Sequence, residues 1–281
     1  MVFQFPSGVM LDSFRQPLEE ALDSAKWLGA QGLQVYATTG EISPENMTPA
    51  KRREFLRQVK DRGLTISALC GDLGKGFGDA ALNPGLIEAS KRILDLAKDL
   101  ETNVVTTHIG VVPTDPKHPR YAVMQDACGA LARYADEVEA FFAVETGPEL
   151  AVTLKGFLDG LHSHGVGVNL DPANLVMVTG DDPAQAVHTL ADYIVHTHAK
   201  DGRRLLERDP EIIYGLRKDI IMTDEAFVEL ALGEGDVDFP AWLKALEAIG
   251  YRGFLTIERE VGGDPYGDIQ RAVMYLRGLM A

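Results

Sequence analysis

Eight short apolar runs rich in β-forming residues alternate with eight amphipathic segments along this 281-residue chain, and this alternation predicts an α/β fold. Continuous apolar runs are typical of parallel strands that are buried on both faces. Eight strand–helix units in a chain of this length fit a closed (β/α)8 barrel, the TIM barrel. The alternative is an open doubly wound sheet, but no glycine-rich phosphate loop follows the first run to support it. We therefore predict one TIM barrel domain over residues 1–281.

The turn and cap residues divide the chain into these units. Strands are predicted near 2–5, 33–37, 65–71, 103–110, 141–147, 166–172, 193–201 and 254–260. Helices are predicted over 14–30, 49–62, 83–100, 120–139, 149–164, 183–192, 239–249 and 267–280. The second helix is bounded by Thr48 as N-cap, Pro49 at the first helical position and Gly63 after the last turn. The same arrangement recurs around Pro240 in the seventh helix.

One connection is much longer than the others. Residues 202–236 separate the seventh strand from the eighth, so this insertion is expected to lie over the carboxyl-terminal mouth of the barrel. It carries Arg203 and Arg204, which could contact a phosphate or a carboxylate. A solvated charged loop is the favoured interpretation of this pair.

Composition and charge restrict the class of partner. The net charge of −15 and the pI of about 4.9 disfavour nucleic acid and anionic membrane surfaces. Cys70 and Cys128 belong to no disulfide or metal motif. The first residues do not form a signal peptide, and no apolar run approaches the ~18 residues of a membrane span. We predict a cytoplasmic protein, and the sequence leaves both a monomer and a homo-oligomer as alternatives.

Polar side chains gather at the ends of the last four strands. Because side chains alternate along a strand, His196, His198 and Lys200 share one face. The other face then carries Val195, Thr197 and Ala199, which suit packing against helices. The two histidines and the lysine are therefore expected to point into the barrel.

The same alternation directs Glu145, Asp171 and Glu258 inward at the ends of strands five, six and eight. Three carboxylates in one buried mouth would repel one another and raise one another's pKa. A divalent cation removes this repulsion, and a carboxylate-rich set with one imidazole favours Mn²⁺, with Mg²⁺, Co²⁺ or Zn²⁺ as alternatives. Convergence from four consecutive strands outweighs the ordinary reading of each residue as a structural hydrogen-bonding group.

Several segments resemble the xylose-isomerase-like sugar isomerase and epimerase superfamily. They are "VETG" at 144–147, "VNLDPANL" at 168–175, "VHTHAKD" at 195–201 and "LGEGDVDFPAWLKALEAIGYRGFLTIERE" at 232–260. With "HIG" at 108–110, the resemblance covers about residues 30–281. The superfamily includes tagatose and psicose 3-epimerases, hydroxypyruvate isomerases, inosose dehydratase and the endonuclease IV branch, and it implies a TIM barrel.

The resemblance also implies one divalent metal ion. Its ligands, a Glu, an Asp, a His and a Glu from strands five to eight, correspond here to Glu145, Asp171, His198 and Glu258. His198 matches rather than His196, because the ligand of the superfamily directly precedes the x-K-D sequence. Lys200 is implied to contact the substrate, whereas His196 is expected to be a hydrogen-bonded residue one layer deeper in the barrel.

The resemblance implies that Glu145 and Glu258 are also the two catalytic groups. They would transfer a proton between opposite faces of a keto sugar or sugar derivative through an enediolate, in a metal-dependent isomerase or epimerase. One alternative is a lyase or dehydratase acting on an inosose or a 3-keto-glycoside. The other is a non-catalytic sugar- or metal-binding barrel, which would not need two opposed bases.

Some positions depart from the superfamily pattern. Asn174 stands where the ketohexose 3-epimerases have a histidine, and strands two and three lack the extra histidines of the endonuclease IV branch. Asn174, His108, Glu260 and Lys200 are the expected contacts to a small keto-sugar or polyol-derived substrate. The remaining histidines are expected on the surface: His118, His162, His164 and His188.

Overall fold

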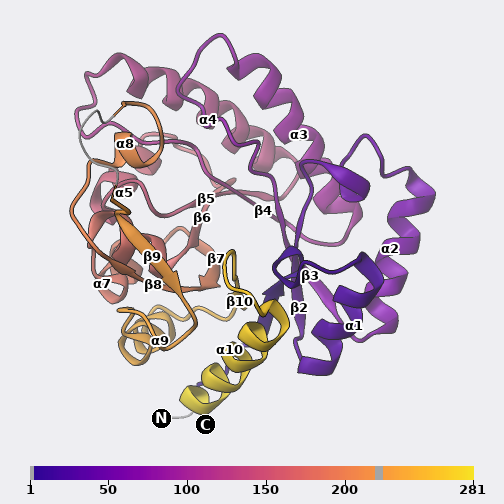
Figure 1. The fold of residues 1–281 in the computed structure, drawn as a ribbon. Coiled ribbons are helices and arrows are strands. Elements are labelled where there is room, and N and C mark those ends of the chain that lie inside the picture. The colour runs from indigo at the N-terminus through magenta and orange to yellow at the C-terminus, as the bar shows by residue number, and fades with distance from the viewer. Residues whose placement is uncertain (1–2, 219–223) are drawn as a thin grey trace.

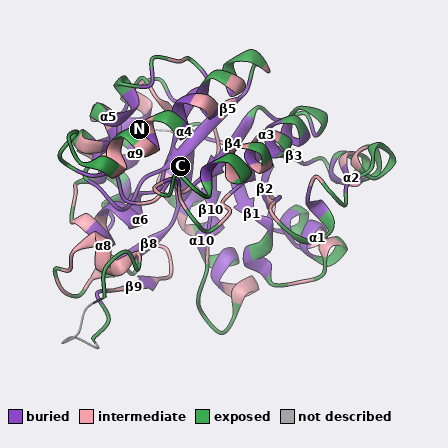
Figure 2. Cartoon of the chain, turned by 90° about the horizontal axis from the view of Figure 1, so that it is seen from above, coloured by how far each residue is buried: buried purple, intermediate pink, exposed green. Residues whose placement is uncertain are grey.

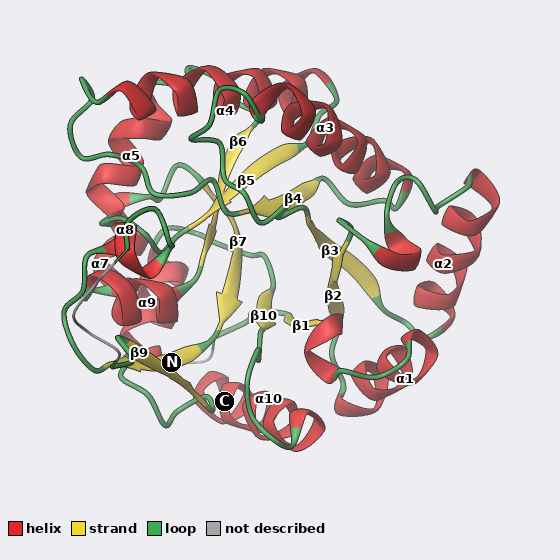
Figure 3. Ribbon diagram, turned by 45° about the horizontal axis from the view of Figure 1, so that its top comes forward, coloured by secondary structure: helices red, strands yellow, loops and turns green. Residues whose placement is uncertain are grey.

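A closed eight-stranded parallel barrel surrounded by helices forms the centre of the computed structural model, which describes residues 3–218 and 224–281 (Figures 1 and 3). Around the barrel the strands follow the order β1-β10-β7-β6-β5-β4-β3-β2. These strands are β1 Ser7–Met10, β2 Gly32–Tyr36, β3 Thr65–Cys70, β4 Val104–Thr107, β5 Phe141–Glu145, β6 Val166–Leu170, β7 Ile194–Ala199 and β10 Leu255–Ile257. The predicted (β/α)8 barrel is therefore confirmed.

The outer layer consists of helices that cover the barrel, with their buried faces inward and exposed faces outward (Figure 2). The long helices are α1 Leu18–Leu28, α2 Pro49–Asp61, α3 Asn83–Asp99, α4 Pro119–Glu137, α5 Ala151–Asp159, α7 Pro183–Thr189, α9 Phe239–Ala248 and α10 Pro265–Met280. Short helices are α6 Pro172–Asn174, α8 Pro210–Ile213, η1 Leu11–Phe14, η2 Gly40–Ile42 and the π-helix η3 Leu175–Thr179. No helix in the described ranges is long and apolar enough to cross a bilayer.

The expected cap residues bound the helices. The Thr48 hydroxyl accepts a hydrogen bond from the Lys51 N–H at the start of α2, and the Asp238 carboxylate accepts one from the Ala241 N–H at the start of α9. Gly63, after α2, has a φ of 74°. This left-handed conformation disfavours side chains with a Cβ, which explains the glycine at that position.

The first strand lies later than predicted. The expected strand near residues 2–5 is wrong, because the barrel strand starts at Ser7, and Val2 lies outside the described residues. Pro6 has no N–H for a ladder, but its carbonyl accepts a hydrogen bond of 2.9 Å from the Leu255 N–H. The alternating phenylalanines before it suggested a strand, whereas Phe5 packs outside the ladder against the Tyr251 ring. Closure against the last strand still occurs, through Ser7–Val9 and Leu255–Ile257.

Val195 also differs from the expectation. It packs against Ala68, Val104 and Ala143, the apolar cluster inside the barrel, rather than against the helices. The cause is a bulge, because Ile194 pairs with Val168 while His196 pairs with the next residue, Asn169. Residue 195 is the extra residue, so the strict alternation of faces fails there.

The insertion after β7 forms a small layer over the barrel mouth. Strand β8 (Asp201–Arg204) pairs antiparallel with β9 (Phe227–Leu230), and α8 lies between them in the chain. Part of the predicted insertion, 219–223, lies outside the described residues. The Asp201 carboxylate holds the far end of the insertion, since it accepts hydrogen bonds from the N–H groups of Gly233, Gly235 and Val237.

The seam between β1 and β10 provides a test of the fold. A Cβ on Gly8 would lie 2.8 Å from Oγ1 of Thr256 inside the barrel, whereas a Cβ on exposed Gly156 in α5 would meet nothing within 4 Å. Gly8→Val is expected to lower the free energy of unfolding by about 1–3 kcal/mol through overpacking. Gly156→Val should change it by less than about 0.5 kcal/mol. Urea denaturation measures both, and equal stability of the two variants would contradict the close approach at this seam.

Candidate functional site

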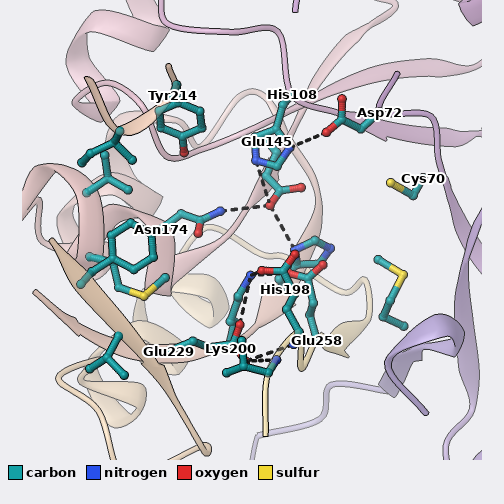
Figure 4. Close-up of a pocket in the computed structure, with 18 of the residues that line it drawn as sticks. Cys70, Asp72, His108, Glu145, Asn174, His198, Lys200, Tyr214, Glu229 and Glu258 are labelled. Carbon is teal, nitrogen blue, oxygen red and sulfur yellow. Dashed lines mark hydrogen bonds and ion pairs between the residues drawn. The ribbon is translucent and has the colours of Figure 1, made fainter. Parts of the chain in front are cut away.

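A cavity of about 610 Å³ opens at the carboxyl ends of the barrel strands (Figure 4). Strand ends and the loops that follow them contribute its polar lining, which comprises Asp72, His108, Glu145, Asn174, His198, Lys200, Glu258 and Glu260. The insertion covers one side with Ile213, Tyr214, Glu225, Phe227, Val228 and Glu229. The predicted position of the insertion at this mouth agrees with the structure.

Four side chains at the base of this cavity converge on one point. Glu145, Asp171, His198 and Glu258 each offer one ligand atom, and these atoms lie within 4.8 Å of one another. Nδ1 of His198 lies 3.2 Å from a Glu258 oxygen, 3.3 Å from an Asp171 oxygen and 3.5 Å from a Glu145 oxygen. All four are buried, so their charges are poorly screened by water. The donor set fits a hard or borderline divalent ion.

Asp171 is positioned by its place at the end of β6. Its Oδ1 caps α6 by accepting hydrogen bonds from the N–H groups of Ala173 and Asn174, at 2.8 and 3.0 Å. Its own N–H donates to the Thr146 hydroxyl at 2.8 Å. These bonds fix the carboxylate and leave Oδ2 directed at His198.

A hydrogen bond to Gln34 in β2 orients the His198 ring. Its Nε2 lies 2.9 Å from Oε1 of Gln34, and the Gln34 amide nitrogen donates to the Thr106 hydroxyl at 2.8 Å. The Gln34 oxygen is therefore the acceptor, so Nε2 carries the hydrogen and Nδ1 faces the three carboxylates. A metal-binding histidine needs this arrangement, with its second nitrogen donating to a neighbouring acceptor.

His196 lies one layer deeper, where a hydrogen-bonded barrel residue was expected. Its Nδ1 lies 2.9 Å from Oδ1 of Asn169, and its Nε2 lies 3.0 Å from the Thr256 hydroxyl. Burial, together with the neighbouring His198, lowers the pKa of His196 well below its usual range, so the ring is neutral. Asn169 then donates to Oε2 of Glu145 at 3.1 Å, which links this layer to the site.

Two basic side chains, His198 and Lys200, lie beside the carboxylates of this site. Burial by itself would lower the pKa of His198, but Glu258 and Glu145 raise it well above the usual value. Lys200 responds in the same way: burial would lower its pKa, but Glu258, Asp171, Glu260 and Glu229 raise it well above the usual value. Conversely, His198 and Lys200 overcome the effect of burial on Glu258 and hold its pKa well below the usual range.

Lys200 joins the barrel to the insertion. Its Nζ lies 3.0 Å from an oxygen of Glu258, 2.6 Å from one of Glu260 and 3.7 Å from one of Glu229 in β9. Lys200 and Glu258 are buried, whereas the side chain of Glu260 is 58% exposed at the rim. Lys200 and Glu260, two of the four residues expected to contact the substrate, therefore line the cavity and pair with each other.

The other two expected substrate contacts surround Glu145. His108 lies between Oδ2 of Asp72, 3.2 Å from Nδ1, and Oε1 of Glu145, 3.5 Å from Nε2. Although burial lowers the pKa of His108, Glu145 and Asp72 raise it to about 9. Asn174 donates from Nδ2 to the same Glu145 oxygen at 3.1 Å.

Sequence reasoning missed several residues of this site. Gln34 and Asn169 are polar residues at inward positions of otherwise apolar strands, so the alternation argument could have found them. Asp72 follows β3 by two residues and could have been paired with His108. Tyr214 and Glu229 come from the insertion, which has no periodicity from which to assign a direction. The four histidines expected on the surface are all exposed.

Comparisons with known proteins support the barrel fold and identify the family. A family model described as a xylose isomerase-like TIM barrel matches residues 22–279. A xylose isomerase domain protein from Planctomyces limnophilus is 25% identical, with a TM-score of 0.80 over 99% of this chain and 96% of that one. A probable 3-DHS dehydratase of petrobactin synthesis from Bacillus anthracis is 17% identical, with a TM-score of 0.76 over 97% and 98%. A 3-keto-D-glucoside 4-epimerase from E. coli is 16% identical, with a TM-score of 0.72 over 98% and 99%. Because the dehydratase and the epimerase are only 17% and 16% identical to this chain, their similarity shows a shared fold and nothing more.

The buried position of Lys200 leads to a stability prediction for the metal-free protein. Lys200→Met should lower the free energy of unfolding by about 3–5 kcal/mol in the presence of a chelator, because the carboxylates lose a buried partner. The control is Lys155→Met, which removes an exposed pair with Asp159 and should cost less than about 0.5 kcal/mol. Chemical denaturation measures both. Similar losses in the two variants would refute the electrostatic role of Lys200.

Proposed function

The chain belongs to the xylose isomerase-like TIM barrel family, and from this premise we propose that it is a divalent-metal-dependent isomerase or epimerase of a keto sugar or sugar derivative. The observation that supports this proposal best is the pair Glu145 and Glu258, whose carboxylates flank Nδ1 of His198 at the base of the cavity. They come from β5 and the end of β10, which β6 and β7 separate in the barrel. A substrate held between them would meet a carboxylate on each side.

Glu145, Asp171, His198 and Glu258 would hold the ion. The convergence of their ligand atoms and the orientation of Nδ1 of His198 toward the three carboxylates fit this role. When bound, the ion would polarise the substrate carbonyl and stabilise the negative charge of the enediolate. The three carboxylates and one imidazole favour Mn²⁺, with Mg²⁺, Co²⁺ or Zn²⁺ as alternatives.

The protein side chains would transfer the proton. One glutamate removes the proton beside the carbonyl, and the other returns a proton to the opposite face of the same carbon. Lys200, within 3.0 Å of Glu258, would keep that carboxylate ionised, and His108 with Asn174 would hold the Glu145 carboxylate in position. Lys200, Glu260, His108 and Asn174 line the cavity and would bind the hydroxyl groups of the substrate.

A lyase or dehydratase is the second candidate. His108 supports it, because this residue lines the cavity and its pKa of about 9 keeps it protonated near neutral pH. A protonated imidazole beside Glu145 could donate a proton to a hydroxyl or glycosyl oxygen that leaves from the β-carbon. The substrate would then be an inosose, a 3-keto-glycoside or a related β-hydroxy ketone. The dehydratase named among the similar structures is consistent with this alternative.

The two glutamates can be tested separately. Glu145→Gln and Glu258→Gln each keep an oxygen ligand but lose a base, so the metal should stay bound while turnover falls by roughly 10²–10⁴-fold. With one epimer as substrate, one variant should still exchange the α-proton with D₂O and the other should not. With the opposite epimer as substrate, the variant that did not exchange the α-proton should now exchange it, and the other variant should not. Proton NMR follows the exchange, and elemental analysis follows the metal.

The control is Glu234→Gln on the exposed insertion, which should retain wild-type turnover and exchange. Loss of water or of an aglycone from the substrate would identify the lyase instead. Near wild-type turnover in both Gln variants at the site would rule out the two-glutamate mechanism.

A further inference from the structure

One wall of the cavity at the barrel mouth differs in chemistry from its base. The base carries the carboxylates and basic side chains described above, whereas η3 and the insertion contribute mainly apolar side chains. Figure 4 shows Tyr214 and Glu229 on one side of the cavity and Cys70 and Asp72 on the other. The apolar wall consists of Met177, Val178, Ile213, Tyr214, Phe227 and Val228.

Close packing fixes this wall to the barrel. Met177 and Val178 are buried, and a Cβ on Gly202 in β8 would overlap the Met177 sulfur, so the insertion packs directly on η3. Tyr214 reaches from the insertion to the loop after β5. A Cβ on Gly147 in that loop would lie 3.0 Å from the Tyr214 hydroxyl, and the missing side chain leaves room for the ring. The apolar wall is therefore a built surface beside Glu145 and the metal cluster.

The charges near the apolar wall disfavour an anionic group on the substrate. Among the described residues that the insertion brings to this cavity, the charged ones are both acidic, Glu225 and Glu229. Lys200, at the base, already lies 3.0 Å from an oxygen of Glu258 and 2.6 Å from one of Glu260. A phosphate or carboxylate at this wall would therefore meet carboxylates of its own sign.

A free sugar is also a poor match to the apolar wall. It carries a hydroxyl on nearly every carbon, and a hydroxyl that turns toward aliphatic side chains loses water without gaining a hydrogen bond. The cavity of about 610 Å³ lies within the ~300–1,000 Å³ of sites for drug-sized ligands, so a second group fits beside one sugar ring. The rings of Tyr214 and Phe227 and the thioether of Met177 favour an aromatic group there.

We propose that the substrate is a keto-sugar derivative with an uncharged aromatic substituent, whose ring binds at the apolar wall while the sugar lies over the metal cluster. This inference rests on the proposed function, because it names the class of sugar derivative on which the same site acts. The division of labour follows from the geometry. Glu145 and Glu258 act on the sugar, and Tyr214 and Phe227 select the group that is attached to it.

Calorimetric titration with sugars that have no ketone tests this preference without turnover. Phenyl β-D-glucopyranoside should bind at least about tenfold more tightly than methyl β-D-glucopyranoside, because only the phenyl ring covers the apolar wall. D-Glucose 6-phosphate should bind no more tightly than the methyl glucoside. Phe227→Ala should bring the two glucosides within about threefold of each other. Leu205→Ala is the control, since this exposed residue of the insertion lies outside the cavity lining, and it should leave the preference within about twofold.

A second variant keeps this test decisive. Ile213→Ala shortens the apolar wall from α8 if Phe227→Ala does not fold, and it should weaken binding of the phenyl glucoside about threefold. The proposal is overturned if the phenyl glucoside does not bind, if the two glucosides bind equally, or if the 6-phosphate binds more tightly than either. Each of these results would leave the two-glutamate mechanism standing. Conversely, failure of that mechanism in the Gln variants would leave the preference for the phenyl glucoside unchanged.

Discussion

The repulsion among three buried carboxylates at the barrel mouth is the constraint on which the rest of the site depends. Glu145, Asp171 and Glu258 bring ligand atoms within 4.8 Å of one another. Two like charges about 4 Å apart repel by roughly 4 kcal/mol at an effective dielectric constant of 20, so the group needs compensating positive charge. In the metal-free protein that charge comes from His198 and Lys200. A divalent ion would supply it more fully and would take the place of the proton on Nδ1 of His198.

The surrounding structure keeps these groups in place at the cost of a polar barrel interior. Gln34 and Asn169 occupy inward positions where aliphatic side chains would pack, and each is hydrogen-bonded to a residue of the site. Asp201 faces away from Lys200 and binds the N–H groups of Gly233 and Gly235, which fixes the far end of the insertion over the mouth. Functional groups on rigid strands with satisfied partners are preorganised for binding and proton transfer.

Much of this arrangement could be predicted from the sequence, because a closed barrel imposes simple rules. Alternation along each strand correctly directed Glu145, Asp171, His198 and Glu258 toward one volume. The same rule failed at Val195, where a bulge adds a residue. The first strand was misplaced because Ser7 and Gly8 have low β-propensity, whereas the phenylalanines before them alternate.

The insertion and the apolar wall could not be predicted. Glu229, Tyr214 and Phe227 owe their positions to tertiary contacts between distant loops, and no local periodicity encodes such contacts. The interpretation of Arg203 and Arg204 as one solvated pair was incomplete. The two residues alternate on β8, so one faces solvent and the other donates to the Thr179 carbonyl.

Calorimetric titration of the metal-free protein with Mn²⁺ tests the central claim most directly. The raised pKa of His198 keeps its ring protonated at pH 7, so binding should release about one proton for each ion bound. Measurements in buffers of different ionisation enthalpy determine this number. The account predicts that each chain binds one ion and releases about one proton. In His198→Ala this proton release should be absent. Binding of an ion without proton release, or equal release in that variant, would contradict it.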